Sequence, residues 1–105
     1  MAEFPEELLQ CSGFEWDSGI ADKNWDLHRV SRPETEEAFF NRPILVVSDV
    51  EHSQREQRYA ALGKTNAGRR LSIIFTVRRT LVRGISARDM NRRERRFYEQ
   101  ASTTE

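Results

Sequence analysis

Apolar runs separated by polar turns dominate the second half of the chain. Leu71 to Val77 is the longest of these runs, and Ile44 to Val47 is a shorter β-branched run that precedes it. Such runs are typical of strands in a sheet with at least one buried face. Together with weaker patterns elsewhere, they predict five strands, at residues 14–17, 44–47, 59–64, 71–77 and 81–88.

Three other segments carry the signals of helices. Asp17 stands at an N-cap position before residues 18–28, and Ser31 with Glu34 has the spacing of a capping box that opens a second helix. Residues 90–101 have the periodicity of a final helix. The order strand, two helices, four strands, helix predicts an α+β fold: an antiparallel sheet of about four to five strands with two N-terminal helices and a C-terminal helix.

The remaining apolar side chains indicate what is buried. Trp16 and Trp25 are expected in the core rather than on a surface that stacks on bases. Residues 1–12 are expected to form a flexible extension or a single helical turn, within one domain that spans residues 1–105. The last helix is expected to bury the face that carries Met90, Phe97 and Ala101.

Charge changes this picture, because its distribution is uneven although the formal net charge is zero. Residues 1–52 contain four Lys/Arg and twelve Asp/Glu, whereas residues 53–105 contain thirteen and five. Only Lys23 and Lys64 are lysines, and the other fifteen cations are arginines, whose planar fork matches phosphate oxygens. The basic half therefore predicts a polyanionic partner such as nucleic acid, unless the acidic half neutralises it within the fold.

The compartment follows from features that the chain lacks. Cys11 is the single cysteine, so no intramolecular disulfide can form, and the chain is compatible with a reducing compartment. No apolar run approaches the roughly 20 residues that cross a membrane, and the first ten residues are acidic, unlike a secretory signal. We therefore expect a cytoplasmic protein that binds no membrane and no metal.

Few side chains are suited to exchanging protons in phosphodiester cleavage, although the cations that would stabilise a phosphate are abundant. The two histidines are His28 and His52, and arginines near Glu56 or Glu94 would favour a charged carboxylate, a base rather than an acid. Each has a structural alternative. His28 can cap the end of a helix, His52 lies in a polar turn, and Glu94 lies in a charged run that can be a solvated helix face.

Several short motifs occur in order over about residues 14–99. They are Phe14-Glu15-Trp16-Asp17, Asn24 with His28, Glu56-x-Arg58, Leu62-Gly63-Lys64, Ile85-Ser86-Ala87-Arg88, and Arg92-Arg93-Glu94-Arg95 with Tyr98. In this combination the chain resembles the BrnT family, the toxin half of a bacterial type II toxin–antitoxin pair. It departs from the family at Leu27 and Arg29, where Lys and Gly are usual, and at Arg79, where glycine is common.

The resemblance implies a RelE-like ribonuclease fold and a toxin that blocks translation by cutting RNA without a metal or cofactor. It implies neutralisation by a BrnA-like ribbon-helix-helix antitoxin, with operator DNA bound only through the complex. It places Arg58, Lys64 and Arg88 at the scissile phosphate, with His28 and Glu56 as proton carriers. The residues expected to hold RNA are Arg78, Arg83 and Arg95, together with Arg79 on the basis of its charge alone.

Two other functions stay open on the sequence. The same arginines would serve a non-catalytic module that binds nucleic acid through phosphate contacts. They would also serve a protein-binding module whose basic half meets an acidic chain.

Overall fold

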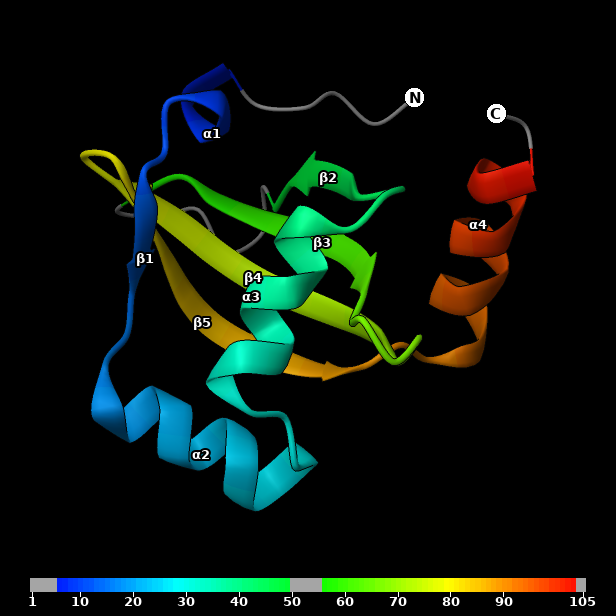
Figure 1. Cartoon of the computed structure of the whole chain (residues 1–105), viewed down its shortest axis with the longest axis horizontal. Coiled ribbons are helices and arrows are strands. Elements are labelled where there is room, and N and C mark those ends of the chain that lie inside the picture. The colour runs from blue at the N-terminus through cyan, green and yellow to red at the C-terminus, as the bar shows by residue number, and fades with distance from the viewer. Residues whose placement is uncertain (1–5, 50–55, 104–105) are drawn as a thin grey trace.

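The computed structural model describes residues 6–49 and 56–103 (Figure 1). All of its strands belong to one sheet, in the order β1-β5-β4-β3-β2. The α+β class and the predicted sequence of strands and helices are confirmed. In chain order, the elements are α1 (Glu6–Leu9), β1 (Gly13–Glu15), α2 (Ser18–His28), α3 (Arg32–Phe40), β2 (Leu45–Ser48), β3 (Arg58–Lys64), β4 (Arg70–Arg78), β5 (Leu81–Asp89) and α4 (Arg92–Thr103).

The sheet is mixed rather than purely antiparallel. Strands β2 to β5 form the expected antiparallel meander, but β1 pairs parallel to β5, with Gly13 opposite Leu81. An apolar pattern locates a strand without naming its partner, and the three residues of β1 pair with a strand at the far end of the sequence. The sequence therefore predicted β1 but not its direction.

Both predicted helix starts are confirmed. The Asp17 carboxylate accepts hydrogen bonds from the backbone N–H groups of Gly19 and Ile20, at 2.9 and 3.2 Å. Ser31 and Glu34 form the reciprocal capping box, each side chain accepting from the other residue's backbone N–H. Both caps satisfy N–H groups that have no partner inside the helix, which fixes where α2 and α3 begin.

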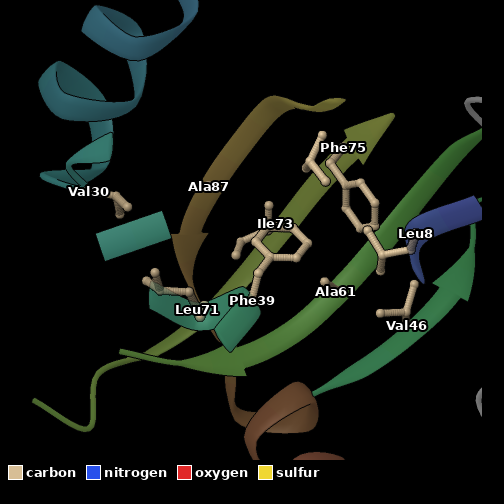
Figure 2. Packing of buried hydrophobic residues seen from close by; sticks show 11 residues of the cluster. Leu8, Val30, Phe39, Val46, Ala61, Leu71, Ile73, Phe75 and Ala87 are labelled. Atoms are coloured by element: carbon tan, nitrogen blue, oxygen red, sulfur yellow. The ribbon is translucent and has the colours of Figure 1, made fainter. Parts of the chain in front are cut away.

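The core lies between α3 and one face of the sheet. Phe39 of α3 packs edge-to-face on Phe75 of β4, with ring centroids 5.0 Å apart. Figure 2 shows Phe39 among Leu71, Ile73 and Phe75, which are fully buried. In Figure 1, α3 accordingly lies across the front of the sheet, while α4 stands beside its right-hand end.

The N-terminal extension contains a short helix that contributes to the core. Residues Glu6–Leu9 form one turn of helix, and Leu8 is 8% exposed and belongs to the core cluster (Figure 2). Residues 1–5 lie outside the described part of the chain. Of the two alternatives expected for residues 1–12, a flexible extension or a single helical turn, residues Glu6–Leu9 form the turn, and Leu8 lies close to Val46 and Phe75 (Figure 2).

Two of the expected core aromatics lie at the surface. Trp25 is 47% exposed, and the Arg29 guanidinium lies 5.3 Å from its ring centroid. On α4, Phe97 is 52% exposed, whereas Tyr98 is 2% exposed and its hydroxyl donates to the Pro43 carbonyl at 2.6 Å. The buried face of α4 is therefore the one that carries Tyr98, because the Tyr98 hydroxyl donates a hydrogen bond to the backbone just before β2.

Helix α2 covers the edge of β5 that β1 leaves unpaired. Strand β1 pairs only with residues up to Arg83, and beyond it the buried Asn24 side chain accepts from the backbone N–H of Ala87, at 3.3 Å. Asn24, which matched the family motif, therefore satisfies an edge donor of the sheet. None of the described helices is long and apolar enough to cross a membrane.

Candidate nucleic-acid interface

The two faces of the sheet differ in chemistry, because successive strand side chains point to opposite sides. On the side covered by α3, β4 presents Leu71, Ile73 and Phe75. The strand register places six cations on the opposite side, which we call the basic face. They are Arg58, Lys64, Arg70, Arg78, Arg83 and Arg88.

One end of the basic face, which we call the Arg58 end, carries a row of three side chains. Arg58 lies opposite Thr76, and Thr76 lies opposite Arg83. Two strand spacings separate the outer members, so the backbones of the two arginines are about 10 Å apart. Such a row can contact one phosphodiester from two sides.

Acidic residues lie beside the arginines at the Arg58 end. The Arg78 Nε lies 3.5 Å from a carboxylate oxygen of Glu56, and an Arg83 nitrogen lies 3.9 Å from Asp17. The Thr76 hydroxyl donates to the Gln57 carbonyl at 2.7 Å, which fixes the backbone between Glu56 and Arg58. The Arg58 end therefore combines one candidate base, Glu56, with several cations.

The opposite end, which we call the Arg88 end, is built around a bidentate ion pair. The two terminal nitrogens of Arg88 donate to the two carboxylate oxygens of Glu94 on α4, at 2.7 and 2.9 Å. The Ser72 hydroxyl donates to the same carboxylate at 3.3 Å. Lys64 lies opposite Arg70, two residues further along the strands than the pair of Leu62 and Ser72. Arg70 forms an ion pair with Glu99 at 2.6 Å.

Electrostatics keep the pair of Arg88 and Glu94 charged. Burial raises the pKa of Glu94, but hydrogen bonds from Arg88 and from the Asn91 backbone bring it below its ordinary value. The hydrogen bond to Glu94 raises the pKa of Arg88 despite partial burial. The sequence offered Glu94 as a candidate base or as part of a solvated helix face, but not as a partner of Arg88. Its spacing from Asn91, which caps α4 reciprocally with it, signals only a helix start.

The residues expected at one phosphate are divided between the two ends. Leu62 of β3 lies in the same cross-strand row as Ser72 and Arg88. Arg58 lies four positions before Leu62 on the same strand. This offset corresponds to about 13 Å along the strands. Arg58 and Glu56 therefore lie at one end, and Lys64 and Arg88 at the other.

His28 lies apart from the other predicted proton carrier. It ends α2 beyond the edge of β5, and its carbonyl accepts from Arg69 at 2.9 Å. Arg69 also donates to Asp89, which lowers the pKa of that carboxyl. Asp89 pairs with Leu71, five positions along β4 from Thr76, so about 17 Å separates this point from the Arg58 end. Glu56 and His28 are not placed as one acid–base pair.

The remaining predicted contacts lie at the margins of the sheet. Arg79 is in the turn between β4 and β5 and has a left-handed backbone, with φ of 57°. Arg95, on α4, borders a polar cavity of about 420 Å³ together with Arg70 and Asp89. His52 lies outside the described residues. Over 6–49 and 56–103, no group of three or more His, Cys, Asp or Glu side chains is arranged to hold a metal ion.

Arg69 is a structural residue that the sequence did not single out. All five of its N–H donors are used, by the carboxylates of Asp89 and Glu34 and by the carbonyls of His28 and Arg29. These bonds join the start of β4 to the end of β5, to the end of α2 and to α3. Hydrogen bonding to Asp89 raises the pKa of Arg69, which stays charged.

An apolar groove of about 300 Å³ adjoins the Arg88 end. It runs between β2, β3 and α4, and the half-exposed Phe97 ring forms one wall. Its lining includes Leu45, Val47, Ala60 and Leu62. The cations of the basic face can take up phosphates, and this groove offers an adjoining surface for apolar or aromatic groups.

Comparison with solved structures supports this fold. A crystal structure of the Brucella abortus ribonuclease toxin BrnT aligns with a TM-score of 0.56 and 20% sequence identity. The alignment covers 76% of this chain and 97% of the Brucella chain. At this identity the likeness shows a shared fold, in agreement with the predicted RelE-like architecture. No curated protein sequence matches the chain.

A family model establishes the relationship at the level of sequence. The model describes the ribonuclease toxin BrnT of type II toxin–antitoxin systems, and it matches residues 16–94, which is more than half of the chain. The matched span contains β2 to β5, but not β1, and it contains all six cations of the basic face. The chain therefore belongs to the BrnT family of ribonuclease toxins.

Proposed function

We propose that this protein is a metal-independent endoribonuclease. The ribose 2′-hydroxyl would attack the adjacent phosphate, leaving a 2′,3′-cyclic phosphate on one product and a free 5′-hydroxyl on the other. The observation that carries this proposal is the grouping of six cations on one face of the sheet in a member of a ribonuclease family. Aimed donors of this kind stabilise the charge that develops on a phosphate, and each is worth about 10²–10³ in rate.

We assign the chemistry to the Arg58 end. Arg58 and Arg83 would contact the scissile phosphate from two sides, and Glu56 would accept the proton of the 2′-hydroxyl. In support, Glu56 is the predicted proton carrier that pairs with a cation of the basic face. We assign no step to His28, because it lies beyond the edge of β5. The proton returned to the leaving oxygen would then come from water.

The Arg88 end would hold the neighbouring nucleotides. Arg88 and Lys64 would contact a second phosphate, about 13 Å from the first along the strands. Arg78 and Arg79 at one margin and Arg95 at the other would lengthen the contact with RNA. Phosphate contacts of this kind position a nucleic acid and make its affinity depend on salt concentration.

We further propose the cellular context that the family implies. The toxin would inhibit translation in the cytoplasm by cutting RNA. A BrnA-like antitoxin with a ribbon-helix-helix domain would neutralise it, and operator DNA would be bound only through that complex. The basic face supports this arrangement, because an acidic antitoxin segment that pairs with these cations would also exclude RNA.

The test is to incubate the purified protein with end-labelled RNA in excess EDTA, both as naked RNA and in a reconstituted translation mixture. The proposal predicts cleavage, with products that carry cyclic phosphate and 5′-hydroxyl ends. Intact RNA in both mixtures, with salt-sensitive binding, would support the non-catalytic module instead. Cleavage that disappears in EDTA and returns with a divalent metal would contradict metal independence.

A further inference from the structure

The donors of Arg88 are only partly used. A guanidinium has five N–H donors in a fixed plane. The first terminal nitrogen of Arg88 donates to Glu94 and to the Asp89 carbonyl, at 2.7 and 3.1 Å, and the second donates to Glu94 at 2.9 Å. Within the described chain, the Nε–H and one N–H of the second terminal nitrogen have no protein acceptor.

These two remaining donors form a fork of their own. Glu94 occupies the end of the guanidinium, between the two terminal nitrogens, while the Nε–H and the remaining N–H point together toward one side. A fork of this kind matches two oxygens of a phosphate in a bidentate geometry. Arg69 provides the internal contrast, because all five of its donors are taken by protein groups.

Glu94 is itself held in place on three sides. Besides Arg88, it accepts from the Ser72 hydroxyl at 3.3 Å and from the Asn91 backbone N–H at 2.9 Å, and its side chain is 23% exposed. These contacts tie it both to β4 and to the first turn of α4. The Glu94 carboxylate therefore has a fixed position, and its two hydrogen bonds orient the guanidinium plane of Arg88.

We propose that Glu94 is a positioning residue that fixes the guanidinium plane of Arg88 and presents its unused side fork to an RNA phosphate. This inference rests on the proposed function, since it needs Arg88 to contact RNA. Holding Arg88 in one orientation before binding removes part of the entropy that would be lost when RNA immobilises it. Glu94 itself does not touch RNA in this arrangement.

The direction in which Glu94→Gln changes the affinity for RNA distinguishes positioning from simple electrostatics. Glu94→Gln adds one net positive charge to the Arg88 end. If Glu94 merely competed with phosphate for Arg88, this variant would bind RNA more tightly. If Glu94 positions Arg88, the variant binds more weakly although the face has become more positive.

Affinity would be measured by fluorescence anisotropy with a fully 2′-O-methylated RNA, which lacks the hydroxyl that attacks the phosphate. We expect Glu94→Gln to weaken binding about 3-fold to 10-fold. Asn91→Ala is the matched control, because it removes the side chain that caps α4 but keeps the pair of Arg88 and Glu94. It should bind within about 2-fold of the parent protein.

Two further variants keep the outcome interpretable. Arg88→Ala should weaken binding at least as much as Glu94→Gln, and normal binding by Arg88→Ala would contradict the assignment of Arg88 rather than the role of Glu94. Ser72→Ala removes the hydroxyl that orients Glu94 and should weaken binding in the same direction, even if Glu94→Gln proves unstable. Unchanged or tighter binding by folded Glu94→Gln would overturn the proposal.

Discussion

At the scale of single residues, two arginines adopt a backbone conformation that favours glycine. Arg29 and Arg79 are the non-glycine residues of the described chain with positive φ, at 53° and 57°. The resemblance noted in the sequence implied glycine at both positions, and glycine adopts this left-handed conformation without steric penalty. Arg29 follows α2, where its N–H bonds back to Trp25 and its guanidinium covers the Trp25 ring. Arg79 lies in an exposed turn.

Arg79→Gly should therefore stabilise the protein. Relief of the left-handed strain outweighs the greater entropy of glycine in the unfolded chain, for a net gain of about 0.5 kcal/mol. Urea denaturation at an unchanged m-value would measure the difference in free energy of unfolding. The same change at the neighbouring strand residue, Arg78→Gly, should destabilise. A loss of stability in Arg79→Gly would contradict the strain interpretation.

The pair of Glu34 and Arg69 gives stability a defined pH dependence. Burial raises the pKa of Glu34, but hydrogen bonds from the Ser31 backbone and from Arg69 bring it below its ordinary value. A carboxyl group whose pKa is depressed by folding stabilises the fold above its unfolded pKa, about 4.3. That stability is lost as pH falls through the lower folded value.

Glu34→Gln isolates this charge, because glutamine can also serve in the capping box with Ser31. We expect a loss of about 1 kcal/mol at pH 7, where Arg69 loses a charged acceptor. The gap between the two proteins should close as pH falls from about 5 to about 3, since protonated Glu34 is also uncharged. Urea midpoints across that range would show it, and a gap that stays constant would contradict the role of the ion pair.

At the scale of elements, α3 closely approaches the sheet where it crosses β3. A Cβ added to Gly63 would lie 2.9 Å from the Ala38 carbonyl oxygen and 3.3 Å from the Ala38 Cβ. The first of these neighbours is backbone and cannot move aside by changing a rotamer. Gly63 thus sets the distance between α3 and the sheet, and with it the packing of Phe39 into the core.

Gly63→Ala should destabilise the protein by about 1–3 kcal/mol, because α3 must shift to admit the methyl group. Gly13→Ala is a matched control in another strand of the sheet, where the added Cβ would meet only the Leu81 side chain at an ordinary 3.5 Å. Thermal unfolding of both variants would measure the difference. Equal stability of the two would mean that the contact between α3 and β3 yields without penalty.

At the scale of the whole molecule, the sequence predicted the elements better than their partners. Strands and caps depend on local spacing. Arg83 and Arg88 lie five positions apart on β5, so alternation alone would put them on opposite faces, and the register shift opposite Ile74 and Phe75 brings them to the same face. Register is not local, so the sequence could not show that Arg58 and Arg88 lie at different ends. The pairs of Arg69 with Glu34 and of Ser72 with Glu94 join positions far apart in the sequence, and no short motif marks them.

The arginines have two different roles, one in stabilising the fold and one in the proposed binding of RNA. Some of the acidic half does neutralise the basic half within the fold, as the pairs of Asp17 with Arg83 and of Glu34 with Arg69 show. Arg69 is saturated by such contacts. Arg88 keeps two donors that no described protein group accepts, and the uneven charge of the chain therefore supports both folding and the proposed contact with RNA.

The most direct test of the basic face compares two double variants that remove equal charge. Arg58→Ala with Arg83→Ala alters the Arg58 end, where the scissile phosphate is assigned. Arg92→Ala with Arg96→Ala removes two exposed arginines from the side of α4 that helical periodicity places opposite Glu94 and Tyr98. The rate of RNA cleavage in EDTA should fall about 100-fold or more in the first and less than about 5-fold in the second. Equal losses in two folded variants would show that net charge alone matters, and would contradict a site on this face.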